Sequence, residues 1–262
     1  MPVHSIASRI SSMNENFWRI YQSLIEPIPK QLEIKGFVQN QKWSAIDSDC
    51  GAGVALCFQP LSGEHQRELA GKPLKEIASW IFSWDFSKAS VGMAAINAFW
   101  NQRNTIEKCF DSKLEELAPS ISIEEYLKKE YAGKKVLFVG YFPFADSLKS
   151  DCEVTILERR ELPGTLPDTA CEALIPENNA IIISASTLVN KTYIRLAQLC
   201  RSKFSIITGP SSPLSPDLKE DGISQVSGIV IKDRRALFKL IGQGASREIL
   251  KPDISWKIDL KF

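Results

Sequence analysis

The sequence predicts an α/β protein in which a small α+β region precedes a region with a mainly parallel sheet flanked by helices. After Gly133, short runs rich in β-branched residues alternate with helical segments. Most of these runs are apolar on both faces, as strands buried between two helical layers must be. Before Gly133 the predicted elements do not alternate in this way. We therefore expect two domains, over residues 1–132 and 133–262, the second of them Rossmann-like.

The first predicted element is a helix over about residues 5–24. Its apolar residues recur at alternating steps of four and three, which places them on one stripe of the helix. They are Ile6, Ile10, Met13, Phe17, Ile20 and Leu24. Pro27 and Pro29 follow directly and are expected to end the helix.

Two β-like stretches and two helices complete the first region. The stretches, at residues 32–39 and 53–58, flank a turn-rich segment at 47–51, and we expect them to pair in antiparallel fashion. The two helices are predicted over residues 73–83 and 88–100.

Five predicted strands form the second region, over residues 135–140, 153–158, 180–185, 204–209 and 226–232. A helix precedes them, opened by a capping box of Ser122 and Glu125. Further helices are predicted near residues 191–202 and 234–242. Their expected N-caps are Asn190 and Asp233. Apolar and polar residues alternate over 256–262, which predicts a final strand with one face in solvent.

The composition argues against several classes of partner. The net charge is +1, so no strong field attracts nucleic acid or an anionic membrane. No segment approaches the roughly 18 apolar residues of a membrane span, and no signal-peptide core opens the chain, so we expect a cytoplasmic protein. The 6 cysteines lie far apart without a Cys-x-x-Cys pair, which favours neither a disulfide framework nor a zinc knuckle.

The loop after the first parallel strand is a candidate ligand site, because ligands bind beyond the carboxyl ends of strands in open parallel sheets. It contains Gly140, Phe142, Pro143 and Phe144, and it lacks the glycines of a dinucleotide fingerprint. Its phenylalanines either pack into an aromatic corner or form a wall on which a ligand stacks.

Acidic residues follow the second strand. Glu158 stands near the usual place of an acid that accepts a hydrogen bond from a ribose diol; the alternative is an ion pair with a neighbouring arginine. Asp168 and Glu172 have i, i+4 spacing, at which two carboxylates can bind a cation or exchange a proton. We take Asp168 and Glu172 as candidate catalytic residues, with stabilisation of a helix dipole by Asp168 as the alternative.

Two later loops offer hydroxyl groups and free amides. Ser186, Thr187, Asn190 and Thr192 follow the third strand, where a helix start can hold a phosphate, sulfate or carboxylate, although capping alone explains Asn190. The candidates after the fourth strand are Gly209, Pro210 and Ser211. Prolines restrict this loop, which suits a binding rim and equally a plain stable loop.

No hydrolase triad or histidine-rich metal site is indicated. His4 and His65 both lie in the first region, and no Gly-x-Ser-x-Gly motif is present. Carboxylates, carbonyls or an isolated thiolate can still hold a metal, but no spacing in the sequence identifies one.

Several motifs in fixed order resemble those of the heavy-metal chelation family, whose function is unknown. In the second region they are Gly140 with Phe142–Phe144, Glu158–Arg159, Pro163–Asp168, Ser186–Thr192 and Gly209–Pro216. In the first region, residues 69–74 and the small-residue run 90–98 carry the same resemblance. Tyr141 stands where relatives commonly have histidine, which removes one candidate metal ligand.

The resemblance implies a first domain like the capping domain of enolases, packed over the Rossmann-like domain, with a ligand site in the cleft between them. Within the small-residue run, Asn97 is a candidate ligand contact. The alternative is that the run serves only close helix packing.

Three functions remain open. The first is binding or processing of a metal chelator or metal complex, so that the bound species is a heavy-metal ion or its chelate. The second is an enzyme with an adenosine-type cofactor, such as S-adenosylmethionine or a nucleotide. The third is a non-catalytic ligand sensor. We expect a small-molecule partner in each case, and the long first helix is a candidate surface for a homodimer.

Overall fold

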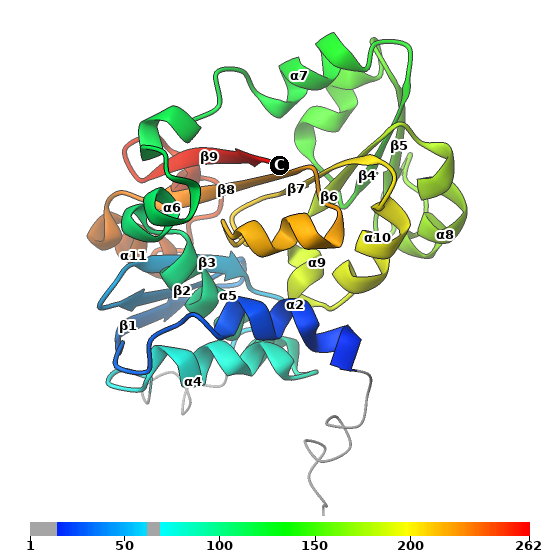
Figure 1. Ribbon diagram of the computed structural model, residues 1–262. Coiled ribbons are helices and arrows are strands. Elements are labelled where there is room, and N and C mark those ends of the chain that lie inside the picture. Colours follow the sequence, from blue (N-terminus) through cyan, green and yellow to red (C-terminus); the bar gives the residue numbers. More distant parts are fainter. Residues whose placement is uncertain (1–14, 62–68) are drawn as a thin grey trace, which may run out of the picture.

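The computed structural model describes residues 15–61 and 69–262, and it contains a small antiparallel sheet followed by a larger, mainly parallel sheet (Figure 1). This arrangement confirms the predicted fold class. The elements before Gly133 are α2 (Glu15–Ile25), β1 (Ile34–Gln39), β2 (Trp43–Ser48), β3 (Ala52–Leu56), α4 (Leu74–Ala78), α5 (Phe86–Trp100), α6 (Arg103–Phe110) and α7 (Ile123–Glu130). The predicted helix residues before Glu15 lie outside the described residues.

The small sheet has three strands, and the expected pairing of its two predicted stretches was wrong. The central strand, β2, pairs with β1 on one side and β3 on the other, both antiparallel. β2 includes Asp47 and Ser48, which were assigned to a turn. Its residues are almost all buried, so the polar–apolar alternation of a half-exposed strand is absent.

Helix α5 packs directly on β3. A Cβ atom added to Gly53 would lie 2.1 Å from the backbone nitrogen of Ala98 and 2.2 Å from the carbonyl oxygen of Ala94. Only a residue without a side chain permits this approach. The small residues of α5 and the glycine of β3 therefore serve close packing.

The large sheet has the strand order β5-β4-β6-β7-β8-β9. Its strands are β4 (Lys135–Val139), β5 (Glu153–Leu157), β6 (Ala180–Ser184), β7 (Phe204–Thr208), β8 (Gln225–Ile231) and β9 (Ser255–Lys261). The first five are parallel, and β9 pairs antiparallel with β8 as the predicted final strand. Since β5 lies on one side of β4 and β6 on the other, the strand order reverses beside β4, where ligands bind in open α/β sheets.

The helices of the second region are short. They are α8 (Cys171–Leu174), α9 (Ser186–Val189), α10 (Tyr193–Cys200) and α11 (Arg234–Gly242). The capping box of Ser122 with Glu125 and the Asp233 cap are confirmed. The Asn190 cap was wrong: Thr192 occupies the N-cap of α10, and Asn190 instead ends α9. Lys191, the residue between them, turns the chain with a positive φ, so α9 and α10 are separate helices.

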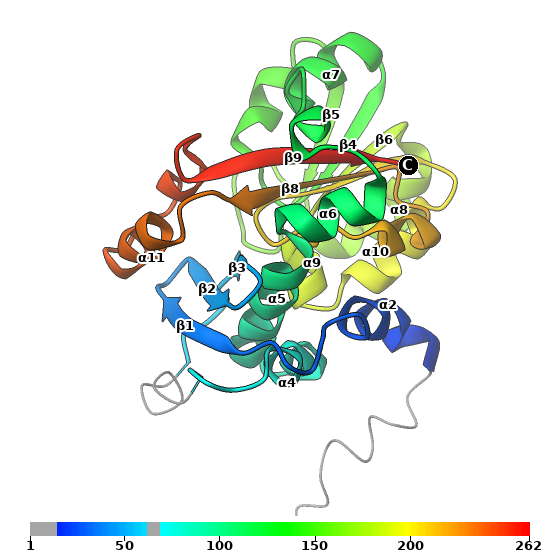
Figure 2. The same cartoon turned by 60° about the vertical axis from the view of Figure 1, so that its left-hand side comes forward.

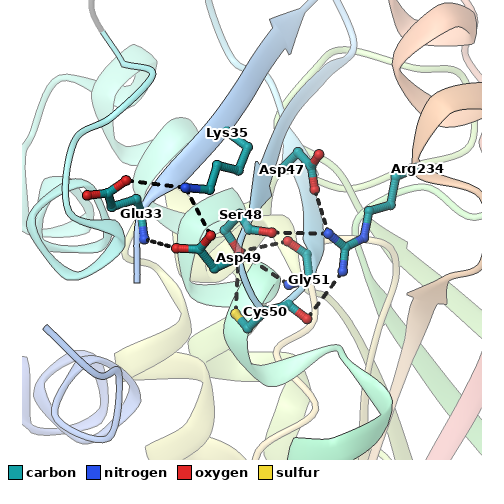
Figure 3. Close-up of polar contacts among 8 residues, drawn as sticks. All are labelled: Glu33, Lys35, Asp47, Ser48, Asp49, Cys50, Gly51 and Arg234. Atoms are coloured by element: carbon teal, nitrogen blue, oxygen red, sulfur yellow. Dashed lines mark hydrogen bonds and ion pairs between the residues drawn. The ribbon is translucent and has the colours of Figure 1, made fainter. Parts of the chain in front are cut away.

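Arg234, the first residue of α11, connects the second region of the chain to the small sheet (Figure 3). Its guanidinium donates to the Asp47 carboxylate at 3.0 Å and to the carbonyl oxygens of Ser48 at 3.1 Å and Cys50 at 3.3 Å. Figure 2 shows α11 beside the small sheet, and apolar residues of α11 pack against β1 and β2. The small sheet is therefore joined to the large one by both polar and apolar contacts.

None of the helices within residues 15–61 and 69–262 combines the length and apolarity that a membrane crossing requires.

Candidate functional site

The carboxyl ends of β4 and β6 meet closely, and we call this region, together with the end of β5, the edge site. Gly140 follows β4 with a φ of 100°, and a Cβ atom added there would lie 2.9 Å from the Cβ of Ser184. The hydroxyl groups of Ser184 and Ser186 lie 2.9 Å apart. Both serines are half-buried, so this hydroxyl pair is partly open to solvent.

Glu158 joins the end of β5 to the same region. Its carboxylate accepts from the backbone N–H groups of Tyr141 and Arg160, each at 3.1 Å, and from the Arg160 guanidinium at 3.3 Å. Burial by itself raises the pKa of Glu158, but these hydrogen bonds outweigh it, so the pKa lies below its usual value. The ion-pair alternative is therefore observed, and both carboxylate oxygens have partners.

The aromatic residues of the first loop form a packed corner. The rings of Phe142 and Phe144 lie 5.6 Å apart and contact the Phe138 ring of β4 at 5.9 Å and 5.7 Å. Pro143 is exposed between them. Tyr141 is also exposed, and its hydroxyl donates to the Asp146 carboxylate at 2.8 Å. Tyr141, rather than the phenylalanines, is the aromatic side chain open to solvent in this loop.

The two candidate catalytic acids are bound to different arginines. Asp168 accepts from Arg159 at 2.9 Å, and Glu172 accepts from Nε and Nη2 of Arg195 at 2.6 and 2.5 Å. The Arg195 ion pair lowers the pKa of Glu172, which keeps the carboxylate ionised. The two carboxylates do not form a shared cation or proton site in this arrangement.

The residues after Ser186 satisfy one another locally. Thr187 is buried, and its hydroxyl donates to the Ser184 carbonyl oxygen at 2.6 Å. The Asn190 side-chain oxygen accepts from the Thr192 N–H at 3.1 Å and from its hydroxyl at 2.7 Å. Of this predicted set, Ser186 alone is paired with a side chain of the edge site.

The loop after β7 lies in a buried contact between the two regions, which we call the seam: β3 and α5 on one side and residues 209–215 on the other. Asn97 is fully buried and donates to the carbonyl oxygens of Val54 at 2.8 Å and Pro210 at 3.3 Å. The Ser211 hydroxyl accepts from the Leu56 N–H at 2.8 Å. Gly209 begins this loop with a φ of 125°. Asn97, Pro210 and Ser211 therefore bond to the other half of the chain, whereas the Gly209 N–H donates to the Ser227 carbonyl oxygen within the large sheet.

Among the buried polar residues that were not singled out from the sequence are Asn101 and Lys191. Asn101 donates to the carbonyl oxygens of Ser212 at 2.8 Å and Ile229 at 3.2 Å and accepts from the Leu214 N–H at 2.8 Å. Its spacing of four residues from Asn97, one helical turn, was an available signal. Lys191 is buried with a positive φ, and nothing local in the sequence indicates either property.

The side chains that the structure describes do not fit a metal ion held by the protein alone. Within residues 15–61 and 69–262, no three His, Cys, Asp or Glu side chains form a metal-binding group. Burial raises the pKa of all 6 thiols, whereas a metal-binding cysteine must lose its proton. His4 and His65 lie outside the described residues. No catalytic step through a protein-bound metal follows from these side chains.

Two family models match most of the chain. One covers residues 125–258 and the other residues 21–100, and the description of each reads "Putative heavy-metal chelation". The chain belongs to this heavy-metal chelation family. The family assignment made from the sequence motifs is thereby confirmed.

Solved structures of similar proteins share the fold. A protein of unknown function from Desulfitobacterium hafniense is 31% identical, with a TM-score of 0.82 over 95% of this chain and 100% of that chain. Another, from Pyrococcus horikoshii, has a TM-score of 0.76 at 20% identity over 94% of this chain and 100% of that one. An uncharacterised protein from Methanocaldococcus jannaschii is 29% identical over 170 residues, which are 62% of this chain and 62% of that protein.

Proposed function

We propose that this protein binds a small metal chelate at the edge site. The observation that carries the proposal is the convergence of three strand ends. Gly140 allows the ends of β4 and β6 to approach closely, and the Ser184–Ser186 hydroxyl pair lies there. The loop at Tyr141, which Glu158 binds, brings the end of β5 to the same place. This is the reversal point at which doubly wound sheets bind ligands.

A chelate suits these residues better than a bare ion. Asp168, Glu172 and Glu158 each pair with an arginine, so an incoming cation would have to displace an arginine from each. A chelator brings its own donor atoms. Hydroxyl and backbone N–H groups then need only recognise the polar periphery of the complex.

The test is isothermal titration of the native protein with nickel and cobalt in three forms. These are the chloride salts, the citrate complexes and the nitrilotriacetate complexes, with each chelator alone as a further titrant. We expect at least one complex to bind in the micromolar range and the chlorides to bind at least tenfold more weakly. Binding of the bare ions as tight as that of the complexes, or no binding tighter than millimolar, contradicts the proposal.

A matched pair of variants locates the binding. Ser186→Val removes one hydroxyl of the pair and adds bulk, and it should weaken chelate binding at least tenfold. Ser202→Val makes the same change at an exposed serine beyond the end of α10 and should leave binding unchanged. Thermal unfolding of both variants checks that they are folded. Equal binding by the two variants would show that the ligand binds outside the edge site.

An adenosine-type cofactor is the second candidate, favoured by the position of Glu158 at the end of β5 beside the Gly140 loop. A ribose diol would have to share a carboxylate that already accepts from Tyr141 and Arg160. If such a cofactor binds, Glu158→Ala should weaken it by about 1–3 kcal/mol. Absence of a thermal shift with S-adenosylmethionine and with ATP removes this candidate.

A further inference from the structure

Lys191 combines three features that are unfavourable in a folded chain. Its φ is 68°, it is 4% exposed, and its ammonium group forms no ion pair with any described residue. Within residues 15–61 and 69–262, the other non-glycine residue with a positive φ is Asp111. Asp111 is exposed and ends α6, where a left-handed residue is common. Lys191 likewise follows the C-cap residue of α9, where a left-handed residue is common, so its burial without an ion pair to any described residue is the feature that remains to be explained.

The surroundings of the Lys191 amine are mainly apolar. Its Nζ donates to the Val189 carbonyl oxygen at 2.7 Å and lies 5.6 Å from the centroid of the Phe86 ring. The Phe86 ring in turn lies 5.6 Å from the ring of Phe58, which is 38% exposed. The amine is therefore buried beside an aromatic pair, of which the Phe58 ring reaches the surface.

Ionisable groups on the elements packed against this segment have other partners. On α5, Asp85 caps the helix and Lys88 lies over the Trp80 ring. On α2, Arg19 pairs with Glu220 and Asp221, and the Tyr21 hydroxyl donates to the Leu188 carbonyl oxygen. On α10 they are Tyr193, which donates to Asp221, and Arg195, which pairs with Glu172. Burial is accordingly the cause that lowers the pKa of Lys191 to about 7.

We propose that Lys191 is the reactive amine of a second site, between α9 and the first turn of α5, that takes a small apolar or aromatic carbonyl compound. The Nζ lone pair attacks the carbonyl carbon and a C–N bond forms. The carbonyl oxygen leaves as water with the two hydrogens of the amine, and an imine remains. A desolvated lysine among apolar groups is a known form of activated nucleophile. Phe86 and Phe58 offer the aromatic surface for the substrate. The proposal is independent of the edge site.

The test is reductive trapping on the native protein. Benzaldehyde and sodium cyanoborohydride are added at pH 7, and the labelled lysines are identified by peptide mapping with mass spectrometry. An ordinary lysine, with a pKa near 10.4, is neutral in only about one molecule in 2,500 at this pH, whereas a pKa near 7 leaves about half neutral. We expect Lys191 to be labelled at least tenfold faster than Lys88.

The comparison is made within the wild-type chain, so it does not depend on the folding of a variant. A Lys191-to-Lys88 labelling ratio below ten overturns the proposal. Labelling in denaturant, where all lysines become alike, verifies that the Lys191 peptide is detected. The variant K191M, checked for folding by circular dichroism, should lose the fast-reacting fraction and keep the slow labelling of the other lysines.

Discussion

The seam and the edge site contain the same kinds of residue, yet their hydrogen bonds run differently. In the seam, the side chains of Asn97 and Ser211 bond across the boundary between the two regions of the chain. In the edge site, Ser184 and Ser186 bond to each other, and Glu158 bonds within the loops of one sheet. Asn97 and Ser211 are buried, whereas both edge serines are half-buried.

This difference separates structural polar groups from those that can exchange partners. A buried amide whose partners belong to the other half of the chain cannot turn to a ligand without leaving groups unpaired, at a cost of about 1–3 kcal/mol each. A partly exposed hydroxyl pair can exchange one partner for a ligand or water at little cost. The seam is therefore expected to control stability and the edge site to control binding.

The largest expected effect is that of Gly53→Ala, which tests the closeness of the seam. The new Cβ would overlap the α5 backbone at Ala94 and Ala98, and neither β3 nor α5 can shift without opening the contact. We expect a loss of at least about 3 kcal/mol in the free energy of unfolding, or no folded protein. Gly242→Ala is the control, because its nearest neighbour lies at 3.9 Å. A Gly53→Ala protein as stable as the control would show that the seam is loosely packed.

A second prediction compares a polar residue of the seam, Asn101, with one of the edge site, Ser186. Asn101→Ala leaves the carbonyl oxygens of Ser212 and Ile229 and the N–H of Leu214 without their side-chain partner, and should destabilise the protein by about 2–3 kcal/mol. Ser186→Ala should change stability by less than about 0.5 kcal/mol. Urea unfolding measures both. Similar losses for the two variants would remove the distinction between seam and edge.

Lys191 belongs to neither the seam nor the edge site, and its burial should make the stability of the protein depend on pH. Because its pKa is lowered to about 7 in the folded protein, the unfolded chain binds more protons between about pH 7 and pH 10. The free energy of unfolding should therefore rise with pH across this range. We expect the stability of K191M relative to the wild type to increase by up to about 1.4 kcal/mol for each pH unit as the pH falls from about 10 to about 7, and to level off below pH 7. Urea unfolding at several pH values gives the two curves, and parallel curves would contradict the buried-amine description.

Much of the large sheet could be predicted because each strand carries its signal locally. The five parallel strands were located to within about one residue, since runs buried on both faces are continuously apolar. Strand β2 was missed because its sequence mixes polar and apolar residues without a strand pattern, and its burial comes from α5 and α11. Helix α6 was missed as well: its amphipathic pattern spans only 8 residues.

The sequence predicted which residue types lie at the candidate site, but not whether each of them is buried or which partner it has. The carboxyl-end rule selected both Ser186 and Ser211, but which of them would be covered depends on where β3 packs. The positive φ of Lys191 and the pairing of Asp168 with Arg159 are likewise consequences of tertiary structure. No pattern in the neighbouring sequence encodes these features.

The smallest expected effect concerns Glu158, whose pKa is lowered by its partners despite burial. A carboxylate with a lowered pKa stabilises the folded state above its unfolded pKa, near 4.3, and this contribution is lost as the pH falls through the folded value. Glu158→Gln should therefore lower stability at pH 7 and have less effect near pH 3. Arg160 is largely exposed, so solvent screening limits the difference to less than about 1 kcal/mol. Glu161→Gln, at an exposed acid of the same loop, is the control. Equal acid sensitivity of the two variants would show that the Tyr141 loop does not depend on Glu158, and the edge site would then lose one of the contacts that hold its strand ends together.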